Sequence, residues 1–118
     1  MKYLALLLLA CVADTHAASF DCRKATTSVE KRVCANPLLG RLDDAMAHNY
    51  RGSLGARLDA SSMQHLMTSQ RAWLKQRDQC KDDACLEARY RARIDALCEY
   101  APATGVNSGC VVSSDDVR

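Results

Sequence analysis

Residues 63–98 read MQHLMTSQRAWLKQRDQCKDDACLEARYRARIDALC, and this stretch decides the fold. Its first half places apolar and long side chains at helical spacing, namely Met63, Leu66, Met67, Gln70, Trp73, Leu74 and Arg77. Its second half repeats the spacing with Cys85, Leu86, Tyr90, Ile94, Leu97 and Cys98. Between the halves lies Cys80-Lys81-Asp82-Asp83-Ala84-Cys85, in which either aspartate can cap the second helix. The stretch predicts two helices joined by a short turn with a cysteine at each end.

Two more helices are predicted on the N-terminal side of this stretch. Thr27 and Glu30 have the spacing of a capping box and predict a short helix that ends near Ala35. Asn36 followed by Pro37 is a start signal for a longer helix. The apolar positions of that helix are Leu38, Leu39, Leu42, Met46, Tyr50, Leu54 and Leu58.

The second half of the long helix carries two glycines. Gly52 and Gly55 each cost about 1 kcal/mol relative to alanine, so fraying or a kink is expected near residues 51–58. Residues 59–62, Asp-Ala-Ser-Ser, then provide a loop and an N-cap for the next helix.

The expected fold class is all-α, because no segment alternates between apolar and polar residues as a strand does. We expect a small, disulfide-stapled bundle of three to four helices over residues 18–100. Residues 101–118 carry Pro, Gly, Asn and Ser and are expected to form an irregular C-terminal tail held near Cys110.

Residues 1–17 have the pattern of a secretory signal peptide. Lys2 gives a positive start, residues 4–12 an apolar run, and Thr15-His16-Ala17 a small-residue cleavage site. The apolar run is shorter than the about 20 residues that a membrane-spanning helix needs. We therefore expect cleavage after Ala17, no transmembrane segment, and a periplasmic or secreted mature protein.

A lipoprotein is the alternative interpretation of the same segment. Leu8-Leu9-Ala10-Cys11 has the shape of a lipid-attachment box, so Cys11 would carry a lipid anchor. A leader of ten residues would be unusually short, and for this reason simple cleavage is favoured over the anchor.

Six of the seven cysteines lie after the leader, an even number that suits an oxidising compartment. They are Cys22, Cys34, Cys80, Cys85, Cys98 and Cys110. Sequence cannot choose among the many pairings of six cysteines. Closeness along the chain suggests Cys22 with Cys34, Cys80 with Cys85, and Cys98 with Cys110.

Several segments follow one another in a recognisable order: Phe20-Asp21-Cys22, VEKRVC at 29–34, QRAWLKQRDQC at 70–80, and Ala84-Cys85-Leu86. With Asn36-Pro37, Leu42-Asp43, Tyr50 and residues 90–94, they resemble the LprI-type lysozyme inhibitor domain. The resemblance covers nearly all of residues 20–97. It implies an exported, disulfide-bonded, mainly helical domain of the bacterial envelope, with inhibition of lysozyme as its activity. Cys98, Cys110 and the tail after Tyr100 depart from the pattern.

Four residues are candidates for binding a protein partner. Trp73 and Arg77 share one face of a predicted helix, and Trp with Arg is a pairing common at the centre of binding surfaces. The competing interpretation is that the single Trp fills the core and Arg77 anchors the next turn. Asp82 and Asp83 lie in a short turn that a disulfide would make rigid, and rigidity reduces the entropy lost on binding. Their competing role is helix capping.

Other functional classes lack support in the sequence. The leader removes one of 16 basic and one of 14 acidic residues, so the net charge stays at +2 and does not indicate a nucleic-acid partner. Arg89, Arg91 and Arg93 are spread around a helix and are expected to form a solvated face. No second ligand pair accompanies Asp44 and His48, so no metal and no cofactor is expected. No catalytic motif of a hydrolase is present, and we expect no enzyme activity.

Two functional hypotheses follow. The first is an envelope protein that binds lysozyme and blocks its cleft. The second is a non-inhibitory structural or stress-related protein that binds peptidoglycan or another envelope component. A cleft-filling inhibitor should present a protruding turn at residues 80–85 beside an exposed apolar patch, whereas a smooth polar surface would weaken that hypothesis.

Overall fold

The computed structural model describes residues 18–56, 58–99, 110 and 112–118. The described chain forms a 3-10 turn η1 (Cys22–Lys24), four helices and a second 3-10 turn η2 (Ser114–Asp116). The helices are α1 (Ser28–Ala35), α2 (Pro37–Gly55), α3 (Ala60–Arg77) and α4 (Asp83–Cys98). No strand occurs in these ranges, so the prediction of an all-α fold is confirmed. The predicted signal peptide, the Cys11 lipid box and most of the predicted tail lie outside the described residues.

Each helix begins at a side-chain cap that the sequence predicted. Thr27 Oγ1 accepts a hydrogen bond from Glu30 N (3.1 Å) at the start of α1. Asn36 Oδ1 accepts from Leu38 N (3.0 Å) at the start of α2. Asp59 and Asp82 cap α3 and α4 in the same way, at 2.8 Å from Ser62 N and Cys85 N respectively. These bonds satisfy backbone donors that the first helical turn leaves free.

Helix α2 runs through Gly52 and ends at Gly55, within the range 51–58 where weakness was expected, so Leu58 lies beyond the helix. Tertiary packing explains why the helix continues past Gly52. Ser53 is fully buried and its hydroxyl donates to the Leu97 carbonyl of α4 at 3.4 Å. Packing against α4 offsets the low helix propensity of the two glycines.

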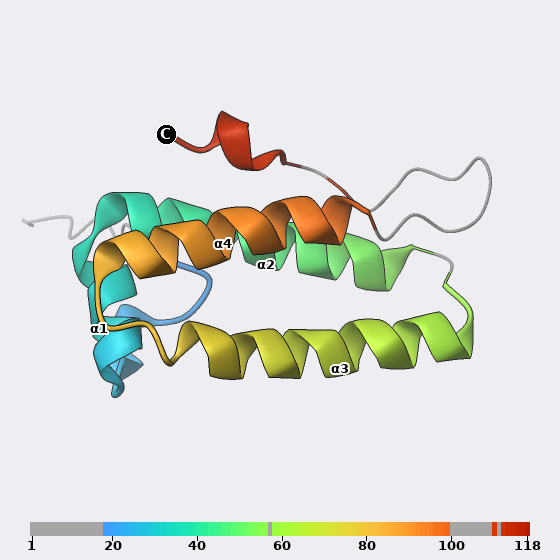
Figure 1. Cartoon of the computed structure of the whole chain (residues 1–118), viewed down its shortest axis with the longest axis horizontal. Helices are drawn as coiled ribbons and strands as arrows, with labels where there is room; N and C mark the ends of the chain where they lie inside the picture. Colours follow the sequence, from blue (N-terminus) through green and yellow to red (C-terminus); the bar gives the residue numbers. More distant parts are fainter. Residues whose placement is uncertain (1–17, 57, 100–109, 111) are drawn as a thin grey trace, which may run out of the picture.

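The core lies mainly between α2 and α4, which run side by side (Figure 1). Its fully buried aliphatic side chains come from α1, α2, α3 and α4: Val29, Val33, Leu39, Leu42, Leu66, Leu86, Ile94 and Leu97. Helix α1 lies at the end of this pair where α2 and α4 begin (Figure 1).

Helix α3 joins the bundle through polar as well as apolar side chains. Gln70 Oε1 accepts from Arg93 Nε at 3.0 Å, and the ring of Trp73 packs edge-on against Tyr90 with centroids 5.3 Å apart. Arg93 also donates to the Ser69 hydroxyl at 3.0 Å and is only 8% exposed. The expectation that Arg93 belongs to a solvated face is therefore wrong, because the guanidinium finds two buried or half-buried partners on α3.

The structure contains three disulfides with the pairing that closeness along the chain suggested: Cys22–Cys34, Cys80–Cys85 and Cys98–Cys110. The first ties η1 to α1, the second spans the α3–α4 turn, and the third ties the end of α4 to the tail. A core of this size gains much of its stability from such cross-links.

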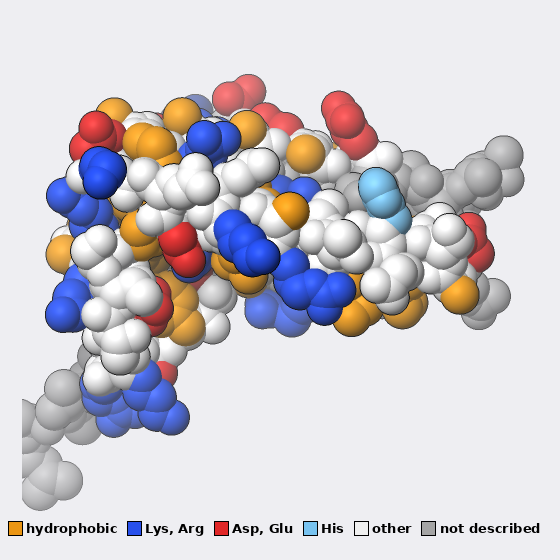
Figure 2. Space-filling view, turned by 60° about the horizontal axis from the view of Figure 1, so that its bottom comes forward, with side chains coloured by type: hydrophobic (Ala, Val, Ile, Leu, Met, Phe, Trp, Pro, Cys, Tyr) orange, Lys and Arg blue, Asp and Glu red, His pale blue; other side chains and the backbone are white. Residues whose placement is uncertain are grey.

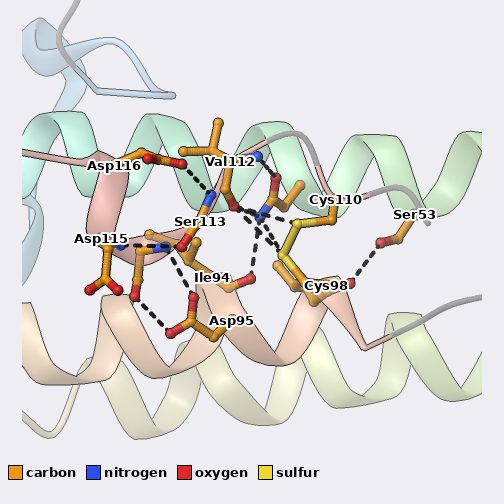
Figure 3. Close-up of a disulfide and its surroundings, with 12 residues drawn as sticks. Ser53, Ile94, Asp95, Cys98, Cys110, Val112, Ser113, Asp115 and Asp116 are labelled. Carbon is orange, nitrogen blue, oxygen red and sulfur yellow. Dashed lines mark hydrogen bonds between the residues drawn. A yellow bond between two sulfur atoms is a disulfide. The ribbon is translucent and has the colours of Figure 1, made fainter. Parts of the chain in front are cut away.

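The described end of the tail packs against α4 and is held by side chains of α2 and α4 (Figures 1 and 3). Asn49 donates to Val112 O (2.8 Å) and accepts from Val112 N (3.0 Å). Asp95 accepts from the backbone and the hydroxyl of Ser114 at 3.0 and 2.7 Å. Arg91 donates to the Ser114 carbonyl at 2.6 Å, so it too is engaged rather than simply solvated. Residues 112–118 are thus an ordered strap on the bundle.

Removing the Cys98–Cys110 bridge should destabilise the protein. We expect the double variant Cys98→Ser, Cys110→Ser to lose about 2–4 kcal/mol of unfolding free energy, because the bridge closes a 12-residue separation. Urea unfolding followed by circular dichroism measures the loss. Asp115→Asn, a change at an exposed position of η2, is the control and should leave the midpoint unchanged. Equal midpoints for the double variant and the parent would contradict the prediction.

Candidate functional site

The candidate site is the disulfide loop, residues 80–85, which joins α3 to α4 at the α1 end of the bundle (Figure 1). Cys80 is buried, whereas Lys81, Asp82 and Ala84 are exposed. The Cys80 amide donates to the Arg77 carbonyl at 3.0 Å, which fixes the loop to the last turn of α3. The loop is therefore an exposed segment with a rigid base.

Asp82 and Asp83, both predicted to contact a partner, also have roles within the fold. Asp82 is the N-cap of α4. Asp83 forms a salt bridge with Arg32 of α1 (3.2 Å) and accepts a hydrogen bond from Asn36 Nδ2 (3.1 Å). The pair with Arg32 is solvent-exposed and contributes little to stability, but it orients the loop against α1. The Asp82 side chain is thus exposed to solvent, whereas the Asp83 carboxylate contacts Arg32 of α1 and Asn36.

Trp73 and Arg77, the other two predicted contact residues, lie beneath the surface with exposed fractions of 7% and 8%. The Trp73 indole N–H donates to the Arg89 carbonyl at 3.3 Å. The Arg77 guanidinium lies 5.9 Å from the Trp73 ring and pairs with Asp78 at 2.9 Å. Their burial supports the structural interpretation of both residues, because a side chain so covered offers little area to a partner.

Arg77 belongs to a core polar network, formed by Ser19, Asp43, Arg77, Asp78 and Tyr90. Tyr90 OH donates to Asp43 Oδ1 at 2.8 Å and accepts from Arg77 at 3.3 Å. The other carboxylate oxygen of Asp43 accepts from the Ser19 amide at 2.8 Å. The network connects the segment before η1 with α2, α3 and α4, and Arg77 also bonds the first residue of the disulfide loop through its backbone carbonyl.

The network keeps Tyr90 protonated. Burial raises the pKa of the Tyr90 phenol well above its usual value, and the nearby Asp43 carboxylate raises it further. A protonated phenol is a hydrogen-bond donor, so Tyr90 remains bound to Asp43 over the whole physiological pH range.

Sequence reasoning did not identify the role of Asp43. The signal was present, since Asp43 lies four residues after Leu39 and three before Met46 and therefore falls on the apolar face of α2. A carboxylate on such a face requires a buried partner. The partners Tyr90 and Arg77 lie on other helices, however, and no spacing along the chain reveals them.

The surface around the loop is polar. Among the described residues the only large hydrophobic side chain that is strongly exposed is Met67 at 38%, on α3 and outside the loop. Figure 2 brings the α3 side forward and shows Lys and Arg side chains in the middle of that face. Helix α3 contains Arg71, Lys75 and Arg77 and no acidic residue. Of the two features expected of a cleft-filling inhibitor, a protruding turn and an apolar patch beside it, the described residues show a turn with exposed residues and no strongly exposed large hydrophobic side chain in it.

The described residues contain no group of three or more His, Cys, Asp or Glu side chains placed to hold a metal ion. None of their helices is long and apolar enough to cross a membrane.

These features define a small, disulfide-bonded helical domain with a polar loop at one end. The family model of the lysozyme inhibitor LprI matches residues 22–99, which is more than half of the chain. The chain therefore belongs to the LprI family, as the resemblance implied. Searches of curated proteins and of solved structures found no match. The match ends at the last turn of the bundle, so Cys110 and the strap at 112–118 lie outside it.

Removing the Tyr90 hydroxyl should weaken the core polar network. We expect Tyr90→Phe to lose about 1–3 kcal/mol of unfolding free energy, because Asp43 and Arg77 would each lose a buried partner. Tyr50→Phe makes the same chemical change at a half-buried position and should cost less. Denaturant unfolding of both variants measures the difference, and an equal loss in the two would argue against a special role for the network.

Proposed function

We propose that this protein is exported, that residues 1–17 are removed on export, and that the mature domain binds lysozyme and inhibits it by blocking its cleft. Membership of the LprI family is the observation that carries this proposal. The family is one of inhibitors rather than of catalysts, which is consistent with a binding function. The three disulfides suit a periplasmic or extracellular location.

The disulfide loop is the proposed contact surface. Its disulfide, the Asp82 cap and the Asp83 contacts to Arg32 and Asn36 hold it in one conformation before binding. A preorganised loop loses little conformational entropy when it enters or covers a cleft.

The charge of the loop suggests where it binds. A glycosidase cleft contains paired carboxylates, which would repel Asp82 and Asp83. Basic residues around such a cleft would attract them and would raise the rate of association. We therefore place the two aspartates at the basic rim of the lysozyme, with the loop covering the cleft. Arg77 then acts as a positioning residue, because its backbone carbonyl accepts from the Cys80 amide at the base of the loop. Trp73 acts through Arg77, whose guanidinium lies 5.9 Å from its ring.

A non-inhibitory envelope-binding protein is the second candidate. The observation in its favour is the polar surface around the loop, which lacks the apolar patch of a typical cleft-filling contact. In this case the protein would sediment with peptidoglycan and leave lysozyme activity unchanged.

The first experiment measures the rate of cell-wall lysis by a c-type lysozyme with and without excess oxidised mature protein. We expect inhibition that is lost after reduction, because reduction opens the disulfide loop. The assay is then repeated with g-type and i-type enzymes. Failure to slow any of the three would rule out the inhibitor proposal.

A charge variant tests the proposed role of the loop. Asp82→Asn keeps a side chain that caps helices well and removes the exposed charge. We expect inhibition to weaken several-fold at low salt and less at high salt, because screening reduces the contribution of the charge. Asp59→Asn is the matched control, since it makes the same change at the N-cap of α3, at the opposite end of that helix. Equal inhibition by the two variants would remove Asp82 from the contact surface.

A further inference from the structure

The segment just before η1 is held by the core polar network. The backbone N–H and the hydroxyl of Ser19 both donate to Asp43 Oδ2. Ala18, the residue before it, is itself 6% exposed and packs with the hydrophobic core. Asp43 therefore fixes the chain at the point where the described structure begins, next to the cleavage site that the sequence predicts.

The charges of the network do not balance. Asp43 is buried, at 1% exposure, and the described cation within salt-bridge distance of it is Arg77, at 3.9 Å. Arg77 lies closer to the second carboxylate, that of Asp78, at 2.9 Å. The Asp78 side chain is 48% exposed, so water also solvates its charge. Arg77 is therefore shared between a solvated carboxylate at 2.9 Å and the buried Asp43 at 3.9 Å, and it compensates the charge of Asp43 only in part. A buried negative charge without full compensation is unfavourable, so a further cation close to Asp43 would stabilise the fold.

Removal of residues 1–17 would create such a cation. The new α-ammonium group would belong to Ala18, one residue from the Ser19 amide that already bonds Asp43 at 2.8 Å. Consecutive Cα atoms are only about 3.8 Å apart, so a change of the Ala18 backbone torsion can bring the ammonium group to the carboxylate. In the uncleaved chain the same nitrogen is a neutral amide.

We propose that Asp43 is the binding site for the α-ammonium group of Ala18, and that cleavage after Ala17 completes the core polar network by supplying its missing positive charge. This inference rests on the export proposed above. Because Arg77 belongs to the network and its backbone carbonyl bonds the Cys80 amide, processing at one end of the chain would also stabilise the base of the proposed contact surface.

The test compares mature chains that differ only at the N-terminus. One begins at Ala18, released from a fusion partner by a protease that leaves this residue first, and a second is the same chain acetylated at the Ala18 nitrogen. A third begins at Ala17, which moves the ammonium group one residue away. At pH 6 we expect the folding equilibrium constant of the Ala18 chain to exceed both others by roughly ten- to a hundredfold, the range expected for a hydrogen bond to a charged group.

Two controls identify the cation and its partner. At pH 10, above the ordinary pKa of about 8 for an α-amino group, the advantage of the Ala18 chain should disappear because the amine is neutral. All three chains contain the groups that face the ammonium group, namely Asp43, Arg77, Asp78 and Tyr90. Any titration of these groups therefore affects the three chains equally and cancels in the comparison. In Asp43→Asn the advantage should also be lost, and if that variant does not fold, the pH comparison decides.

Equal stability of the three chains at pH 6 would overturn the inference. An advantage that persists at pH 10 would overturn it as well, because a neutral amine cannot supply the missing charge. Both readouts are unfolding equilibria and do not depend on lysozyme. A failure here is therefore distinguishable from a failure of the proposed inhibition.

Discussion

The buried carboxylate of Asp43 is the constraint on which the rest of the structure depends. It lies on the apolar face of α2, and leaving it unpaired there would be strongly destabilising. Its carboxylate is contacted from three separate segments, by Tyr90 of α4, Arg77 of α3 and Ser19 of the N-terminal segment. Such a network tolerates only one arrangement of the helices, whereas apolar packing alone would accept several.

The same network relates the core to the proposed binding surface. Arg77 ends α3, and its backbone carbonyl accepts from the amide of Cys80, so this residue contributes its side chain to the network and its backbone to the base of the disulfide loop. At the opposite side of α4, Asn49, Asp95 and Arg91 hold the strap at 112–118 through its backbone. This strap lies beyond the residues that the family model matches.

Local features of the fold were predictable because their causes are local. Thr27, Asn36, Asp59 and Asp82 cap helices through bonds that reach only two or three residues along the chain. The pairing of the cysteines followed closeness in sequence, since each bridge closes a short loop. The binding role of the four candidate residues stays a prediction, and the structure gives only their placement: Asp82 is exposed, Asp83 is half-buried, and Trp73 and Arg77 are buried.

The sequence by itself determined the helices, their caps, the family and the place of the disulfide loop. Only the tertiary structure decided which charges are buried: Asp43, Arg77 and Arg93 find partners 23 to 47 residues away or on another helix. The physical reason is the distance along the chain over which each interaction acts. Helix propensity and capping act within one turn. The pairing of a buried charge instead depends on which helices pack together, and this packing is determined by the core as a whole.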